Sequence, residues 1–163
     1  DRFCVEVDKM VGFHLLQGDS GPFTGIKFKG LAEASGLILK EDGGFHYESK
    51  PESESGGTQR LFSVVNQDSN PFNAEMLRTY VIHGISFQLD IPRVKNCTEV
   101  FNQMVLVARQ MENSLNANLV DDKGRPLDET QIEKIRQQLK VIHAKMVARG
   151  IVPGSDSALR LFS

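Results

Sequence analysis

Residues 84–92 read Gly-Ile-Ser-Phe-Gln-Leu-Asp-Ile-Pro, and this stretch decides the class of fold. Apolar side chains at Ile85, Phe87, Leu89 and Ile91 alternate with polar ones. Successive side chains of a strand point to opposite faces of the sheet, so the pattern predicts a strand that is buried on one face only. Such strands are typical of an antiparallel sheet whose other face stays open to solvent or to a partner.

Length and composition limit the possible functions. The chain has 163 residues, 40% of them hydrophobic, which suits one domain with a core. The formal net charge of -2 gives no reason to expect nucleic-acid binding, which needs a concentrated basic surface. No apolar run approaches the roughly 20 residues of a membrane span. Because the chain begins with Asp1 rather than Met, we expect a fragment, with room upstream for a membrane anchor or a targeting segment.

The two cysteines, Cys4 and Cys97, are too few for a disulfide scaffold. The sequence leaves a bridge between them open, but it favours two buried thiols in a reducing cytosol.

The order of the expected elements indicates an α+β fold of the split β-α-β kind, with helices on one face of an antiparallel sheet. Besides residues 84–92, strands are predicted over residues 3–7, 37–40, 45–48, 60–65 and 118–121. Helices are predicted over residues 24–35, 96–115 and 128–150. The remaining stretches are interpreted as a mobile loop at residues 49–58 and a connector at 66–76.

Capping signals support the last two helices. Asn96 precedes Glu99 by three residues, and Asp128 precedes Gln131 by three, the spacing of a capping box. Gly150 is placed to end the last helix.

No pattern in the sequence points to catalysis or to a metal. The histidines, at positions that share no metal-binding spacing, are His14, His46, His83 and His143. Asp121 and Asp122 read as the start of a tight turn rather than as an acid–base pair. We therefore expect no cofactor, no metal and no enzymatic activity.

Five short segments follow one another in a characteristic order. They are Ala34-Ser-Gly-Leu-Ile38, Leu61-Phe-Ser-Val-Val-Asn66, Phe72-Asn-Ala-Glu-Met76, the strand at residues 84–92, and Leu119-Val-Asp-Asp122 with Arg125 and the helix start at Asp128. In this order and spacing, from about residue 31 to residue 147, the chain resembles the family of C-terminal, FtsZ-binding domains of the bacterial cell-division protein ZipA. The first predicted strand also matches the family, and by this resemblance residues 11–22 are interpreted as an insertion.

The resemblance implies three helices on one face of an antiparallel sheet of about six strands. It also implies a cytoplasmic domain, over residues 1–149, of a protein held in the inner membrane by an N-terminal anchor that is absent from this chain. The partner would be the C-terminal peptide of FtsZ, bound in a shallow apolar groove on the exposed sheet face, so that the protein tethers the Z-ring to the membrane. Residues 150–163 run past the last helix of the family, and their polar first part is expected to form a flexible extension. The apolar residues at 158–162 leave open that this end docks on a groove of this chain or of a neighbour.

The groove positions of the family fall on residues that we expect on the outward side of the sheet. They are Arg2, Cys4, Gly43, Phe45, Val65, Gln67, Ser86 and Gln88. We expect Phe45 and Val65 at the centre, flanked by Cys4, Gln67 and Gln88. The two glutamines stand where the best-known family member has large apolar residues.

Two other classes of function remain open from the residues alone. One is a regulatory split β-α-β module that binds a small metabolite or a different protein, which a deep, polar-lined pocket would favour. The other is an enzyme, which would need a pair of titratable groups clustered in a cleft.

Overall fold

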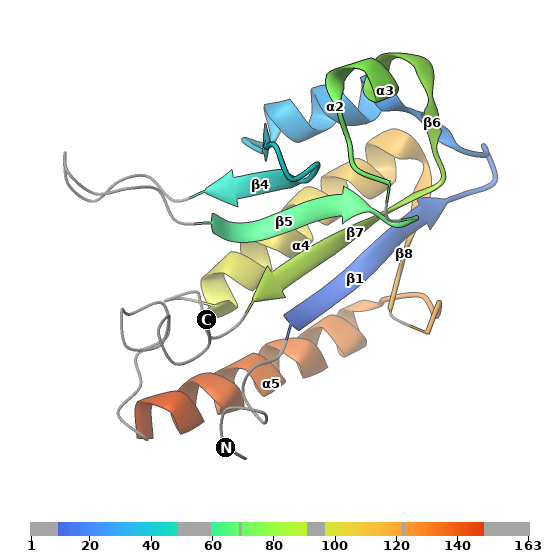
Figure 1. Ribbon diagram of the computed structural model, residues 1–163. Helices are drawn as coiled ribbons and strands as arrows, with labels where there is room; N and C mark the ends of the chain where they lie inside the picture. Colours follow the sequence, from blue (N-terminus) through green and yellow to red (C-terminus); the bar gives the residue numbers. More distant parts are fainter. Residues whose placement is uncertain (1–9, 49–59, 69, 91–96, 122, 149–163) are drawn as a thin grey trace.

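A six-stranded antiparallel sheet forms the centre of the computed structural model, which describes residues 10–48, 60–68, 70–90, 97–121 and 123–148 (Figure 1). The strand order is β3-β4-β5-β7-β1-β8. The strands are β1 (Met10–Gln17), β3 (Ile38–Leu39), β4 (Phe45–Glu48), β5 (Arg60–Asn66), β7 (Gly84–Asp90) and β8 (Ala117–Val120). A separate two-stranded sheet pairs β2 (Phe23–Thr24) with β6 (Val81–Ile82).

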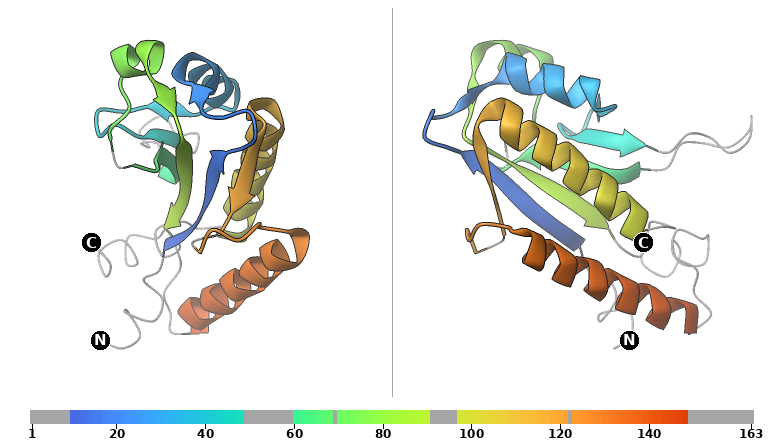
Figure 2. Two further views of the ribbon diagram at one scale, coloured as in Figure 1. Left: turned by 90° about the vertical axis from the view of Figure 1, so that its right-hand side faces the viewer. Right: turned by 180° about the vertical axis from the view of Figure 1, so that it is seen from behind.

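The larger helices lie on one side of this sheet, as the sequence predicts. The helices are α2 (Gly25–Ala34), α3 (Ala74–Thr79), α4 (Cys97–Leu115) and α5 (Glu129–Ala148). Helix α4 crosses the rear face of the sheet, and α5 runs below the β1 side of it (Figure 2). The α+β class is confirmed. The described residues hold four helices where the resemblance implies three.

Helix α3 lies partly within residues 66–76, which were expected to be a connector, so that interpretation is wrong there. Asn73 begins the helix by accepting a hydrogen bond from the Met76 backbone N–H at 2.8 Å, and Leu77 is its buried residue. Six residues are too few to show a helical period, because the period becomes visible only over about three turns.

Strand β1 corrects a second expectation. Residues 11–22 were interpreted as an insertion, yet β1 is an inner strand that pairs with both β7 and β8. Phe13 and Leu15 are fully buried, as the alternation of a strand requires. Leu16, a large apolar residue on the opposite face, hides that alternation in the sequence. The strand predicted at residues 3–7 lies outside the described residues.

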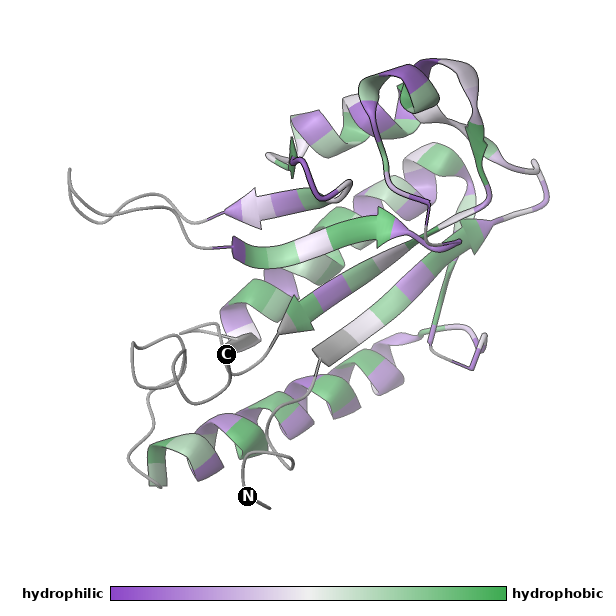
Figure 3. Ribbon diagram, in the orientation of Figure 1, coloured by the Kyte–Doolittle hydropathy of each residue, from purple (hydrophilic) through white to green (hydrophobic). Residues whose placement is uncertain are grey.

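The buried face of the sheet agrees with the alternation that predicts a half-buried strand at residues 84–92. Ile85, Phe87 and Leu89 of β7 and Phe62 and Val64 of β5 are all buried. Hydrophobic and hydrophilic residues alternate along β7, whereas β5 has two pairs of adjacent apolar residues (Figure 3). Burying side chains of this size contributes about 1.5–3 kcal/mol each, so this face supplies much of the drive to fold.

The predicted helix ends are confirmed where the structure describes them. Gly36 has a φ of +88°, the left-handed conformation that commonly ends a helix, and its N–H donates to the Glu33 carbonyl at 3.0 Å. Asp128 accepts from the Gln131 N–H at 2.9 Å and so caps α5. The expected cap at Asn96, the loop at residues 49–58 and the extension at residues 150–163 lie outside the described residues. Among the described helices, none has the length and apolar character needed to cross a bilayer.

Candidate functional site

The face of the sheet turned away from α4 carries no helix within the described ranges (Figure 1). The strand register decides which side chains lie there, because residues opposite each other in a ladder share a face. We call this surface the open face. Its central residues are His14, Leu16, His46, Ser63, Val65, Ser86 and Gln88.

Several of the expected groove residues come together on the open face. Val65 lies opposite Ser86 in the β5–β7 ladder, and Gln88 lies opposite Ser63 one step along. The Gln67 N–H donates to the Gly84 carbonyl at 3.1 Å, which extends the pairing past the end of β5. Two strands, β5 and β7, thus bring residues distant in sequence into one continuous patch, whose role in binding a partner stays a prediction.

Phe45 does not belong to this patch, and its expected outward orientation is wrong. It lies opposite Val64, with which it shares the buried face, and only 1% of it is exposed. Its ring packs against Phe72 at a centroid distance of 5.7 Å. Within β4, Phe45 and Tyr47 point inward because two aromatic side chains gain more from burial than the polar residues between and after them. His46 takes the place expected for Phe45.

Gly43 acts in the turn of the β3–β4 hairpin rather than as part of the patch. Its φ is +84°, and its carbonyl accepts from the Phe72 N–H at 2.8 Å. A Cβ added here would lie 2.3 Å from the Pro71 Cβ, so only glycine allows the two loops to approach. Cys4 and Arg2 lie outside the described residues.

A chain of three polar side chains crosses from the hairpin onto the open face. Asp42 contacts His46 Nε2 through both carboxylate oxygens, at 2.9 and 2.8 Å. His46 Nδ1 lies 2.7 Å from Ser63 Oγ. Partial burial raises the pKa of Asp42, but the Gly44 N–H, His46 and Arg60 together lower it by more. The pKa of Asp42 is therefore below the usual 3.8. The carboxyl group is therefore ionised at neutral pH.

A second histidine–serine pair lies on the neighbouring strands. His14 and Ser86 face each other across the β1–β7 ladder, and His14 Nδ1 lies 2.7 Å from Ser86 Oγ. Sequence reasoning missed His14 because β1 was not recognised, and it missed His46 because the outward residue of β4 was assigned one position too early. The alternation of residues 45–48 contained the signal for His46.

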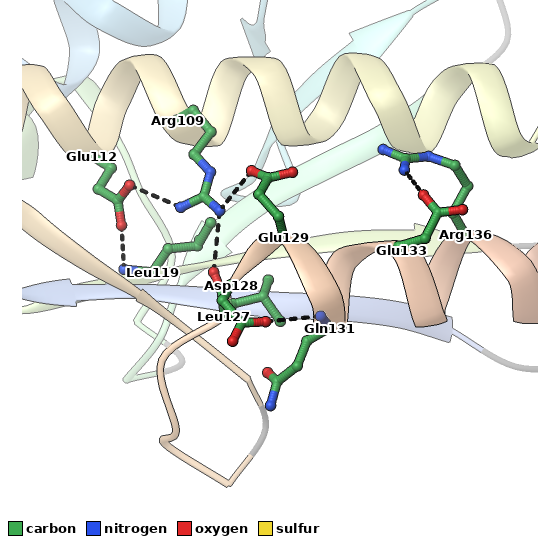
Figure 4. A network of polar contacts seen from close by, with 9 residues as sticks. All are labelled: Arg109, Glu112, Leu119, Leu127, Asp128, Glu129, Gln131, Glu133 and Arg136. Atoms are coloured by element: carbon green, nitrogen blue, oxygen red, sulfur yellow. Dashed lines mark hydrogen bonds and ion pairs between the residues drawn. The ribbon is translucent and has the colours of Figure 1, made fainter.

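Another polar network ties α4, β8 and the start of α5 together (Figure 4). Arg109 donates to the Leu127 carbonyl at 3.1 Å and pairs with Glu112 at 3.0 Å and Glu129 at 3.3 Å. Glu112 in turn accepts from the Leu119 N–H at 2.9 Å. These contacts satisfy backbone groups at the junction of the three elements, so the network holds the fold together.

The chemistry on the open face suits recognition by hydrogen bonds and small apolar contacts. Within the described ranges, no three His, Cys, Asp or Glu side chains gather closely enough to hold a metal ion.

The region of the chain that matches known proteins extends over most of the described fold. A family model described as "ZipA, C-terminal FtsZ-binding domain" matches residues 9–138, from just before β1 into α5. The chain is 28% identical over 134 residues to the cell division protein ZipA of Pseudomonas putida strain W619, which covers 82% of this chain and 45% of that protein. The ZipA protein of Marinobacter nauticus is 28% identical over 141 residues, covering 86% of this chain and 41% of that protein. The chain thus spans less than half the length of these relatives.

Proposed function

The chain belongs to the family of ZipA C-terminal, FtsZ-binding domains, and from this premise we propose that it binds the C-terminal tail of FtsZ on its open face and so tethers the division ring to the inner membrane. The family description and the names of the relatives support a role in cell division. The family is one of binding domains, so the chain serves as a scaffold rather than as an enzyme.

The observation that carries the proposal is the composition of the open face. Val65 and Leu16 offer half-buried apolar surface, while Ser63 and Ser86 are small and recessed, at 8% and 6% exposed. A shallow floor of small residues beside a few apolar side chains suits an extended peptide, because such sites draw most of their affinity from a few anchors.

The tethering half of the proposal concerns the whole protein. The P. putida relative extends well beyond the matched region, which is 45% of its length. We place the membrane anchor in the N-terminal part of a full-length protein of this kind. Imaging of the full-length protein with and without that part would test the placement.

Titration of the fluorescently labelled domain with the C-terminal peptide of FtsZ from the same organism tests the binding half. We expect saturable binding, and no binding of a scrambled peptide. Amide chemical shifts should change at Val65, Ser86 and Gln88 and stay constant along α5. Shift changes confined to α5 or to the two-stranded sheet would contradict the assignment of the site.

A pair of matched variants separates loss of the site from loss of the fold. Val65 is half-buried on the open face, and Val141 is 54% exposed on α5. Val65→Gln removes an apolar contact and should weaken binding about fivefold or more, as loss of an interface anchor does. Val141→Gln makes the same chemical change elsewhere and should bind the peptide as the parent does.

A further inference from the structure

The hydrogen-bond chain from Asp42 to Ser63 determines which ring nitrogen of His46 carries a hydrogen. Asp42 is ionised, so both its oxygens can only accept hydrogen bonds. Each lies within 3 Å of His46 Nε2, at 2.9 and 2.8 Å, so that nitrogen must carry the hydrogen. The Gly44 N–H, which donates to Asp42 at 3.0 Å, holds the carboxylate in place, and Arg60 lies 3.9 Å from it.

The position of that hydrogen determines the role of Ser63. When Nε2 of a neutral imidazole carries the hydrogen, Nδ1 has a free lone pair and accepts. His46 Nδ1 is 2.7 Å from Ser63 Oγ, so beside a neutral imidazole the serine hydroxyl donates its one hydrogen to that nitrogen. Toward any further partner, Ser63 Oγ can then act only as a hydrogen-bond acceptor.

The strand register places Ser63 on the open face between two longer side chains. Ser63 lies opposite Gln88, and Gln88 lies opposite Gly12 on the other side, where no side chain stands. Ser63 is small and lies between His46 and Gln88, which explains its exposure of only 8%. A group that reaches it must approach from above the sheet.

We propose that Asp42, acting through His46, holds Ser63 as a hydrogen-bond acceptor on the open face, and that Ser63 selects a donor group of the bound peptide. The donor is a backbone N–H or a Ser, Thr, Asn or Lys side chain. Ser63 would be a specificity-determining residue, and Asp42 and His46 its positioning residues. This inference rests on the proposed binding of the FtsZ tail to the open face.

A scan of the peptide tests the selection. FtsZ tail peptides with one backbone N–H methylated at a time, or one polar side chain changed to alanine, are titrated into the parent domain and into Ser63→Ala. One modification should weaken parent binding about tenfold, the loss expected from one hydrogen bond, and the same modification should have little further effect on Ser63→Ala. Additive losses at every position would overturn the inference.

Asp42→Asn tests the positioning role without removing Ser63. An amide both donates and accepts, so it no longer forces the hydrogen onto His46 Nε2. At about pH 8, above the ordinary titration range of imidazole, ¹⁵N shifts of the His46 ring should show the hydrogen on Nε2 in the parent and at least partly on Nδ1 in the variant. Tail affinity should fall with it. A parent ring with its hydrogen on Nδ1 would overturn the inference whatever the affinity.

The control makes the same chemical change at another aspartate. Asp128 caps α5, where asparagine caps equally well, so Asp128→Asn should keep parent affinity. Parent-like binding by both Ser63→Ala and Asp42→Asn overturns this inference alone. Failure of the parent domain to bind the tail overturns the proposed function, and this inference with it.

Discussion

Phe45 and Phe28 pack edge to face in the core, with ring centroids 5.3 Å apart and planes at 86°. The contact joins the β3–β4 hairpin to α2. Aromatic pairs in this geometry stabilise a protein beyond the area they bury. A residue expected to bind the partner therefore belongs to the interior.

Phe45→Ala should lower the free energy of unfolding by about 3–5 kcal/mol, the usual cost of removing a buried phenylalanine. Urea denaturation followed by circular dichroism measures the effect. Phe45→Leu is the control, and it should lose clearly less because most of the cavity stays filled. An Ala variant as stable as the parent but unable to bind the FtsZ tail would restore Phe45 to the binding site.

Arg109→Met should destabilise the domain by about 1.5–3 kcal/mol, because it leaves the Leu127 carbonyl and two carboxylates without their charged partner. Urea denaturation measures the loss, and hydrogen exchange should show it first at the start of α5. Arg136→Met is the comparison. It removes contacts with the side chains of Asn102 and the exposed Glu133 rather than with a backbone carbonyl, and should cost less than about 1 kcal/mol. If both variants lost the same stability, Arg109 would contribute no more to the fold than Arg136 does.

Gly43→Ala and Gly124→Ala form a matched pair. Both glycines have a left-handed φ, +84° and +80°, but a Cβ at Gly43 meets Pro71 while a Cβ at Gly124 meets nothing within 4 Å. Gly124→Ala should cost about 1–2 kcal/mol for the backbone conformation alone. The cost at Gly43 should be clearly larger, and thermal unfolding of both variants compares them. Equal costs would mean that the hairpin can move away from Pro71 freely.

Lowering the pH should remove the contribution of Asp42 to stability within a narrow range of pH. Its pKa is raised by partial burial but lowered more by the Gly44 N–H, His46 and Arg60, and ends below 3.8. A carboxyl whose pKa is lowered by folding stabilises the native state at higher pH, and that contribution is lost as the pH falls through its native pKa. The stability difference between the parent and Asp42→Asn should thus be constant above about pH 5 and shrink below pH 3.8. A carboxyl ¹³C titration midpoint above 3.8 would contradict this.

The buried half of the sheet could be predicted from the sequence because one local pattern determines it. In β7, Phe87 and Gln88 follow a strict alternation, and the structure buries the first while leaving the second half-exposed. Asp128 likewise predicts the start of α5 from a capping pattern that spans only four residues. Signals of this kind depend only on neighbours along the chain.

The open face was harder to predict because its assembly depends on distant pairings. His46 and Ser63 meet across a ladder although 17 positions separate them, and nothing near either residue announces the other. β1 posed the same difficulty, since residues 3–7 alternate as regularly as Phe13 and Leu15 do. Alternation identifies a strand but cannot say which strand finds partners in the sheet.

The place of β1 in the sheet has a consequence for synthesis on the ribosome. β1 is synthesised early, but its Leu16 pairs with Gly84 on one side and Asn118 on the other. At about 5–20 residues per second, the nascent chain needs roughly 5–20 s to make the last of these partners after β1 has emerged. During that interval the strand with Phe13 and Leu15 has an unsatisfied edge, the kind of surface that pairs with other chains. The sheet is therefore complete only after β8 has been synthesised. A ribosome that pauses between β7 and β8 would leave the domain most prone to aggregate.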